Sequence, residues 1–159
     1  MLEDAITKEG LLKPEILSEL CDKALELSNS IVQYLGTSKK DSLNSIDSNY
    51  MGFYTLECNR MTTGIMQAMS WCLMQKGVSN GEITVAEASE KKNRLSNNQL
   101  FDVLVGCDLD KFPNKFREYS DRVRALYAKI IRVDRLLYEG GFVEDNPVHN
   151  LIEKIENNS

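Results

Sequence analysis

The chain has 159 residues, of which 42% are hydrophobic and 27% are charged, a composition that excludes a disordered chain and a membrane-spanning one. Its net charge of −5 argues against nucleic acid as the main ligand. No apolar run approaches the roughly 18 residues that cross a bilayer, and the first ten residues are acidic where a signal peptide is basic. We therefore expect a cytoplasmic protein that does not bind membranes.

A first long helix is expected from Pro14 to Gly36. Proline suits the first position of a helix, and glycine suits the residue after its C-cap. Apolar residues recur between them at helical steps and mark one buried face: Leu17, Leu20, Cys21, Ala24, Ile31 and Leu35. The polar residues 37–49, rich in Ser and Asn, are expected to form a loop.

A second long helix is expected from about Tyr50 to Lys76, ending at Gly77. Its first apolar set alternates steps of three and four, as in a heptad seam: Met51, Tyr54, Cys58, Met61, Ile65, Ala68 and Cys72. A second apolar set widens this surface: Leu56, Met66, Met69, Trp71, Leu73 and Met74. The helix is therefore expected to face two neighbours.

The middle of the chain predicts short helical pieces. Thr84 and Glu87 form a capping-box pattern that predicts a helix from 85 to about 94. Ser96 and Gln99 repeat the pattern before a short apolar turn that Gly106 should end. Together they predict a helical excursion over residues 84–105.

A third long helix is expected from about Pro113 to Gly140-Gly141. Its apolar residues step 3-4-3-4-3-4 without a break: Phe116, Tyr119, Val123, Leu126, Ile130, Val133 and Leu137. Beyond it, residues 141–159 form an acidic, Asn-rich tail, in which Pro147 is a plausible helix start. Val148, Leu151, Ile152 and Ile155 then have amphipathic spacing.

Together these elements predict an all-α fold: residues 1–140 form an antiparallel, up-down bundle of three long helices, followed by the tail 141–159. Helices with apolar residues on more than one side leave surplus apolar surface. A homodimer with two-fold symmetry would cover it.

No motif for catalysis, metal binding or cofactor binding is recognisable. There is no glycine-rich phosphate loop, no CxxC pair, and one histidine, His149, in the tail. Asp108 and Asp110 precede the third helix, where they compensate the helix dipole. The four cysteines are expected to be reduced, mostly as small apolar groups. We therefore expect a protein that is not an enzyme and uses no cofactor.

The third helix is basic, with seven Lys or Arg against three Asp or Glu in residues 112–138. An alternative function is therefore a DNA-binding transcriptional regulator. In it, five basic residues would contact phosphates while Tyr127 stacks on a base: Arg122, Arg124, Lys129, Arg132 and Arg135. These residues also lie on the side of the helix that the apolar seam does not occupy, as polar residues do on any solvated amphipathic helix.

The second helix carries a polar patch among its apolar residues. Glu57 and Arg60, three apart, can pair along the helix, and Asn59 and the Thr62-Thr63 pair lie beside them. The patch is either a solvated stripe or a partly buried cluster that fixes the register of a helix–helix or subunit contact. In the second case, Arg60→Ala is expected to disturb assembly more than Arg94→Ala.

The segment "FYTLECNRMTTGIMQAMSWCLMQKGVSNGEIT", residues 53–84, closely resembles the central part of the bacterial regulator-of-CtrA-degradation family, RcdA. The segment "SDRVRALYAKIIRVDRLLYEG", residues 120–140, resembles the last helix of that family. The resemblance covers roughly residues 14–140. The acidic tail is shorter here than in that family and rich in Asn.

The resemblance implies a dimeric three-helix bundle that acts as a non-enzymatic adaptor for the ClpXP protease. Its expected partners are a second copy, a response regulator, protease components and cell-cycle regulatory cargo. The surface expected to make these contacts combines residues of the second and third helices: Tyr54, Glu57, Asn59, Arg60, Met61, Arg124, Arg132 and Arg135.

Overall fold

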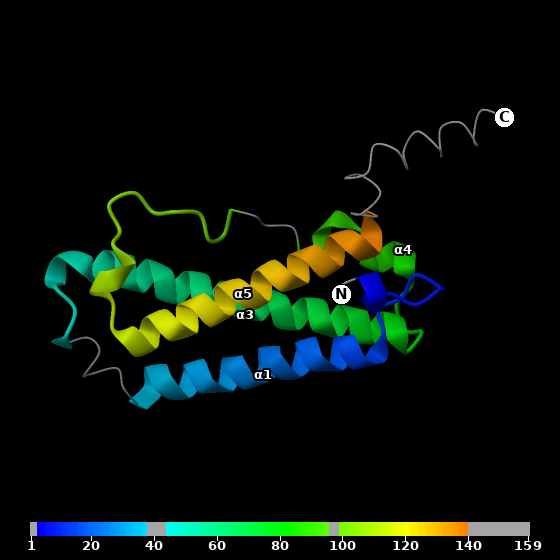
Figure 1. Ribbon diagram of the computed structural model, residues 1–159, viewed down its shortest axis with the longest axis horizontal. Helices are drawn as coiled ribbons and strands as arrows, with labels where there is room; N and C mark the ends of the chain where they lie inside the picture. The colour runs from blue at the N-terminus through cyan, green and yellow to red at the C-terminus, as the bar shows by residue number, and fades with distance from the viewer. Residues whose placement is uncertain (1–2, 38–43, 96–98, 140–159) are drawn as a thin grey trace.

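The computed structural model describes residues 3–37, 44–95 and 99–139. Three long helices dominate it: α1 (Pro14–Thr37), α3 (Met51–Ser79) and α5 (Asn114–Tyr138) (Figure 1). Among the described residues there are also a single-turn helix, α4 (Val85–Ala88), and four 3-10 turns: Glu3–Ala5, Ser48–Tyr50, Lys91–Asn93 and Leu109–Lys111. These ranges contain no β-strand, so the expected all-α bundle of three long helices is confirmed.

The directions of the helices differ in part from the expected up-down order. Tyr34 of α1 stacks on Tyr119 near the start of α5, at 5.2 Å between ring centroids, so α1 runs antiparallel to α5. By contrast, Trp71 bonds Asp134 and Gln75 bonds Tyr138, each across 63 residues. A constant separation means that α3 and α5 run in the same direction, as Figure 1 shows.

A parallel pair requires a long return connection. α3 has 29 residues and is therefore about 43 Å long. Residues 80–113 carry the chain back along this length to the start of α5. The periodicity of each helix could not indicate this direction, because a helix presents the same apolar face whichever way its neighbour runs.

The first half of this connection is less helical than expected. The capping box of Thr84 and Glu87 is present, with both reciprocal hydrogen bonds, but α4 ends at Ala88 instead of reaching about 94. Of α4, only Ala88 is buried. Ser96 and residues 140–159, with the predicted amphipathic tail, lie outside the described residues.

The core lies among the three long helices. α1 contributes the predicted face, and every predicted seam residue of α5 is buried except Leu137, which is half-buried. Tyr54 of α3 packs against Phe112 and Phe116, with the Tyr54 and Phe116 ring centroids 4.6 Å apart. All four cysteines are free thiols, and burial raises the pKa of Cys72, where the neighbouring Cys21 acts in the same direction.

Several apolar side chains stay on the surface. Of the second apolar set on α3, Trp71 is buried, whereas Leu56, Met66 and Leu73 are exposed. Leu25 and Val32 of α1 are exposed as well. Among the described helices, none has the length and apolar character that a membrane span requires.

Candidate functional site

The structure divides the polar patch of α3 into a buried half and an exposed half. Glu57 and Arg60 face α5 and the return connection, with only 1% and 7% of their surface exposed. Asn59 and Thr62 lie on the outer face, where Thr62 donates its hydroxyl to the carbonyl of Cys58. Glu57 and Arg60 are therefore part of the interior, and the exposed residues form a solvated stripe.

The Glu57 carboxylate joins α3 to α5. Its Oε1 accepts hydrogen bonds from the Ser120 hydroxyl at 2.5 Å and from Nη2 of Arg124 at 2.7 Å. Its Oε2 lies 3.5 Å from Nη1 of Arg60. One buried carboxylate thus contacts two guanidinium groups, and this pairing offsets part of the cost of burying the charges.

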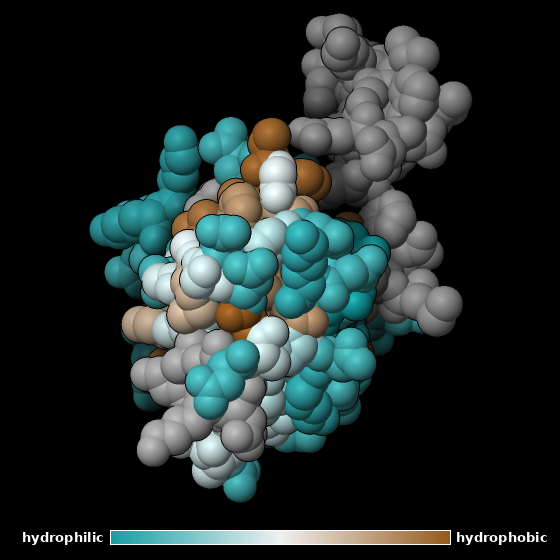
Figure 2. All heavy atoms as spheres, turned by 90° about the vertical axis from the view of Figure 1, so that its left-hand side faces the viewer, coloured by the Kyte–Doolittle hydropathy of each residue, from teal (hydrophilic) through white to brown (hydrophobic). Residues whose placement is uncertain are grey.

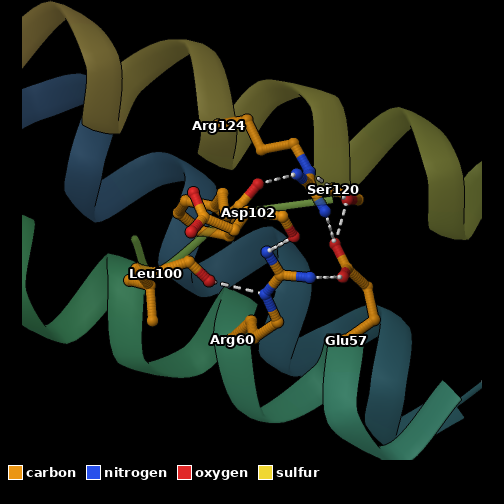
Figure 3. A network of polar contacts seen from close by, with 7 residues as sticks. Glu57, Arg60, Leu100, Asp102, Ser120 and Arg124 are labelled. Atoms are coloured by element: carbon orange, nitrogen blue, oxygen red, sulfur yellow. Dashed lines mark hydrogen bonds and ion pairs between the residues drawn. The ribbon is translucent and has the colours of Figure 1, made fainter. Parts of the chain in front are cut away.

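The two arginines use their other N–H groups on the backbone of the return connection. Arg60 donates to the carbonyls of Leu100 and Asp102, both at 2.6 Å. Arg124 donates to the carbonyl between them, that of Phe101, at 3.2 Å. Figure 3 shows the carbonyls of Leu100 and Asp102 pointing at the guanidinium group of Arg60.

The Phe101 side chain packs against the same two arginines and against α3. The guanidinium carbons of Arg124 and Arg60 lie 4.8 and 5.5 Å from its ring centroid. A Cβ at Gly64 would lie 2.9 Å from the ring, so a glycine is needed for this close approach. Burial lowers the pKa of Arg60, while Glu57 acts in the opposite direction.

Tyr50 holds the next part of the return connection, at Gly106 and Asp108. Its hydroxyl accepts a hydrogen bond from the backbone N–H of Asp108 at 2.8 Å and donates one to the carbonyl of Gly106 at 3.3 Å. Gly106 has a φ of +81°, a conformation that favours glycine. Residues 99–108, called here the pinned loop, are thus fixed by side chains of α3, α5 and the Ser48–Tyr50 turn.

The outer side of the pinned loop is apolar and acidic. Val103 and Val105 are 93% and 96% exposed, and Leu104 between them is half-buried. The exposed acidic residues Asp102 and Asp108 flank the valines. Figure 2 shows hydrophobic side chains at the top of this end of the molecule, where Figure 1 places the loop.

A second buried network holds the first half of the return connection. Asp134 of α5, fully buried, accepts hydrogen bonds from the Trp71 indole and from Nε of Arg94, both at 2.9 Å. Arg94 also bonds Glu139 at 2.6 Å. Desolvation lowers the pKa of Arg94, but its bonds to Glu139 and Asp134 outweigh this and raise it overall. Arg94 is therefore a structural residue, and Arg94→Ala is not a neutral comparison for Arg60→Ala.

The residues expected to form one contact surface fall into three groups. Glu57, Arg60 and Arg124 meet in one network. Tyr54 and Met61 belong to the core, and Asn59, Arg132 and Arg135 are exposed outside the network. Sequence reasoning missed Ser120, Phe101 and the three backbone carbonyls. The carbonyls have no signature in a sequence.

Two residues assigned to the alternative DNA-binding surface have other roles. Tyr127 is buried and donates its hydroxyl to Gln67 at 2.8 Å, so its ring is not available for stacking on bases. The guanidinium of Arg124 is used in the Glu57 network. Arg122, Lys129, Arg132 and Arg135 remain at least partly exposed.

The chemistry of the networks is structural. The hydroxyl of Ser120 bonds Glu57, but Ser120 is buried, so the pair is closed to a substrate. In the described part of the chain, no three His, Cys, Asp or Glu side chains are grouped to hold a metal ion. What the site offers is a rigidly held loop with an apolar, acidic surface.

Comparison with known proteins identifies a family. The model of a family described as "Protein of unknown function (DUF1465)" matches residues 8–158, nearly the whole chain. No curated protein and no solved structure matches the chain.

Proposed function

We propose that this chain, which belongs to the DUF1465 family, is a non-enzymatic adaptor whose pinned loop docks a partner protein. The observation that carries the proposal is the use of Arg60 and Arg124. They donate three hydrogen bonds to the backbone of a loop whose valines are almost completely exposed. Charged groups are costly to desolvate, and here two arginines hold a loop that packs Leu100, Phe101 and Cys107 against the core and leaves Val103 and Val105 in solvent.

Fixing the loop in advance favours binding. A loop that is ordered before binding does not lose its conformational freedom when the partner arrives, so more of the contact energy appears as affinity. Val103 and Val105 would enter an apolar pocket of the partner, and Asp102 and Asp108 would face basic residues on its rim.

The resemblance to the RcdA family supports a specific form of this role. In this form the chain works in the cytoplasm, and its partners are protease components, a response regulator and cell-cycle regulatory cargo destined for ClpXP. The adaptor would act through effective concentration, because two modest contacts on one body raise the local concentration of cargo at the protease.

A second copy of the chain is part of the proposal. Leu25 and Val32 are seven residues apart on one side of α1, and Leu25 is one turn from Cys21, which interacts with Cys72 of α3. The exposed Leu73 follows Cys72. These side chains form an apolar strip along the α1–α3 seam that a two-fold dimer would cover.

The adaptor role is tested by affinity capture from cell lysate with the wild-type chain, Val103→Asp/Val105→Asp and Val85→Asp. Val85 is an exposed valine in α4, outside the pinned loop, and is the control. We expect the wild type and the control to recover protease components or response regulators, and the double variant to lose them. Recovery of metabolic enzymes alone, or equal recovery by all three proteins, would contradict the proposal.

The dimer is tested by light scattering after size exclusion. The wild type should have twice the chain mass of 18.1 kDa. Val32→Asp/Leu73→Asp should shift the protein toward the monomer, because each charge would be buried in the interface. A wild-type chain that stays monomeric at every concentration would refute the dimer and leave the pinned loop as a separate question.

A further inference from the structure

Two cysteine thiols from different helices meet near one end of the bundle. Cys21 lies near the start of α1, and Cys72 lies near the end of α3. The thiols of these two residues are hydrogen-bonded to each other. Because the residues are far apart in the chain, this contact is made by the packing of α1 on α3.

The directions of the helices account for the contact. α1 runs antiparallel to α5, and α3 runs in the same direction as α5, so α1 and α3 are antiparallel. The start of α1 and the end of α3 therefore lie at the same end of the bundle, as Figure 1 shows. This arrangement places Cys21 beside Cys72.

Small side chains next to the cysteines allow the two backbones to approach closely. Ala24 is one turn further along α1, and Ala68 is one turn back along α3. Since the helices are antiparallel, both alanines lie on the same side of the cysteine pair, and both are buried. Helix axes about 8–10 Å apart bring facing Cα atoms to about 3.4–5.4 Å, and a disulfide requires Cα atoms about 4.4–6.8 Å apart. A disulfide between Cys21 and Cys72 therefore fits the spacing of α1 and α3.

The two thiols differ in their access to solvent. Cys21 is half-buried, whereas Cys72 is buried, with 3% of its surface exposed. Burial and the bond to Cys21 raise the pKa of Cys72, while Lys76, one turn further along α3, acts in the opposite direction. Because the thiolate is the reactive form, an oxidant in solution reacts first with Cys21. Cys72 is then the neighbouring thiol that completes a disulfide.

The other two cysteines have different neighbours. Cys58 is hydrogen-bonded to the Tyr54 hydroxyl, and Cys107 lies in the pinned loop near the Glu57 carboxylate. Both are half-buried, as Cys21 is. What sets Cys21 apart is therefore the second thiol beside it, and Cys58 and Cys107 serve as controls of similar exposure.

We propose that Cys21 and Cys72 are a redox-sensitive pair, which a small-molecule disulfide such as oxidised glutathione converts into a disulfide between α1 and α3. The Cys21 thiolate attacks one sulfur of oxidised glutathione and releases a glutathione thiolate, which takes up the proton that Cys21 lost. The Cys72 sulfur then attacks Cys21 and expels the second glutathione, which takes up the proton of Cys72. Two protein thiols are thereby oxidised, and one glutathione disulfide is reduced to two thiols.

The bond ties the start of α1 to the end of α3. It closes the chain from residue 21 to residue 72 into a loop, which restricts the unfolded chain and stabilises the bundle under oxidising conditions. Partner binding by the pinned loop has no part in this inference.

The test treats the folded, full-length protein with oxidised glutathione and then blocks the remaining thiols with N-ethylmaleimide. Trypsin leaves the four cysteines on four separate peptides, so mass spectrometry assigns each bond to its residues. The wild type is compared with Cys21→Ser, with Cys72→Ser and with the matched control Cys58→Ser/Cys107→Ser, which keeps the pair.

We expect the wild type and the control to give linked Cys21 and Cys72 peptides in a protein of single-chain mass. In the control, whose only cysteines are the pair, the intact mass before blocking should fall by about 2 Da, the mass of the two hydrogens lost. Cys72→Ser should retain one glutathione at Cys21, and Cys21→Ser should form no link to Cys72. Dithiothreitol should restore both thiols.

Four results would overturn the proposal. The first is a wild-type protein whose thiols all remain unreacted, and the second is one that keeps glutathione on Cys21 without a link to Cys72. The third is a link to Cys58 or Cys107 as abundant as the link between Cys21 and Cys72. The fourth is linked peptides found only in a species of twice the chain mass, which would place the bond between two copies.

Discussion

Glu57 and Asp134 are both buried between α3 and α5, and both help to hold the return connection. Each of them holds a different part of it. Asp134 bonds Arg94, and the segment next to Arg94 buries Ala88 and Leu95. Glu57 positions two arginines that bond the pinned loop, whose Val103 and Val105 remain exposed.

The difference separates two uses of a buried charge. At Asp134 the polar contacts add to apolar packing, so their loss should weaken the whole bundle. At Arg60 and Arg124 the polar contacts add to the packing of Leu100, Phe101 and Cys107, but the outer side of the loop, with Val103 and Val105, has no packing. Their loss should therefore release the loop more than it destabilises the bundle.

The largest effect is expected for Asp134→Ala. This change leaves the Trp71 indole N–H and the Arg94 guanidinium without their buried acceptor. The free energy of unfolding should fall by about 3–5 kcal/mol. Urea denaturation measures it, with the exposed Asp121→Ala as the control, for which a change within about 0.5 kcal/mol is expected. Similar values for the two variants would show that Asp134 does not stabilise the bundle.

Arg60→Ala should have a smaller effect on global stability, about 1.5–3 kcal/mol, because the loop carbonyls that it leaves can bond water. Its main effect should be faster hydrogen exchange in the pinned loop, at the amides of Asp102, Cys107 and Asp108. Exchange measured by mass spectrometry, with the exposed Arg132→Ala as control, tests this. Unchanged exchange in Arg60→Ala would mean that Arg60 does not hold the loop.

Gly64→Val should disturb the loop from the apolar side. The new side chain would meet the Phe101 ring and Val123, at a cost of about 1–2 kcal/mol because the ring can move away. Gly52→Val is the matched control, since Gly52 lies in the same helix and a Cβ at this position would have no neighbouring atom within 4 Å. Thermal unfolding and loop exchange should change only at Gly64, and equal changes in the two variants would exclude a close approach there.

The smallest effect concerns alkaline pH. Burial raises the pKa of Tyr127 above that of an exposed tyrosine. The unfolded chain therefore releases this proton first, at a pH of about 10, and the stability that Tyr127 contributes is present below that pH and lost above it. Between pH 9 and 11 the urea midpoint should fall less in Tyr127→Phe than in wild type. An equal fall in both proteins would contradict this assignment.

Much of the fold was predictable from residue spacing. The apolar steps of α1 and α5 identify their buried faces, and Pro14 marks the start of α1 as expected. Thr84 and Glu87 form the predicted cap, although the helix that they start is only one turn long. The polar patch at Glu57 and Arg60 was recognisable as unusual in an apolar helix.

The partners of that patch were not predictable. Arg60 bonds the carbonyls of Leu100 and Asp102, forty residues and more away, and every residue has a carbonyl whatever its side chain. Likewise, nothing local to α5 indicates that it runs parallel to α3. That direction follows from the path of residues 80–113, which depends on which contacts the connection makes on its return.

The sequence by itself determined the helices, their buried faces and the presence of a charged pair inside an apolar helix, because helical periodicity and burial are local properties of the chain. Only the tertiary structure decided that α3 and α5 run side by side in one direction. The same contacts decided that Glu57, Arg60 and Arg124 hold a loop with two exposed valines, because residues far apart in the chain meet only once the helices pack.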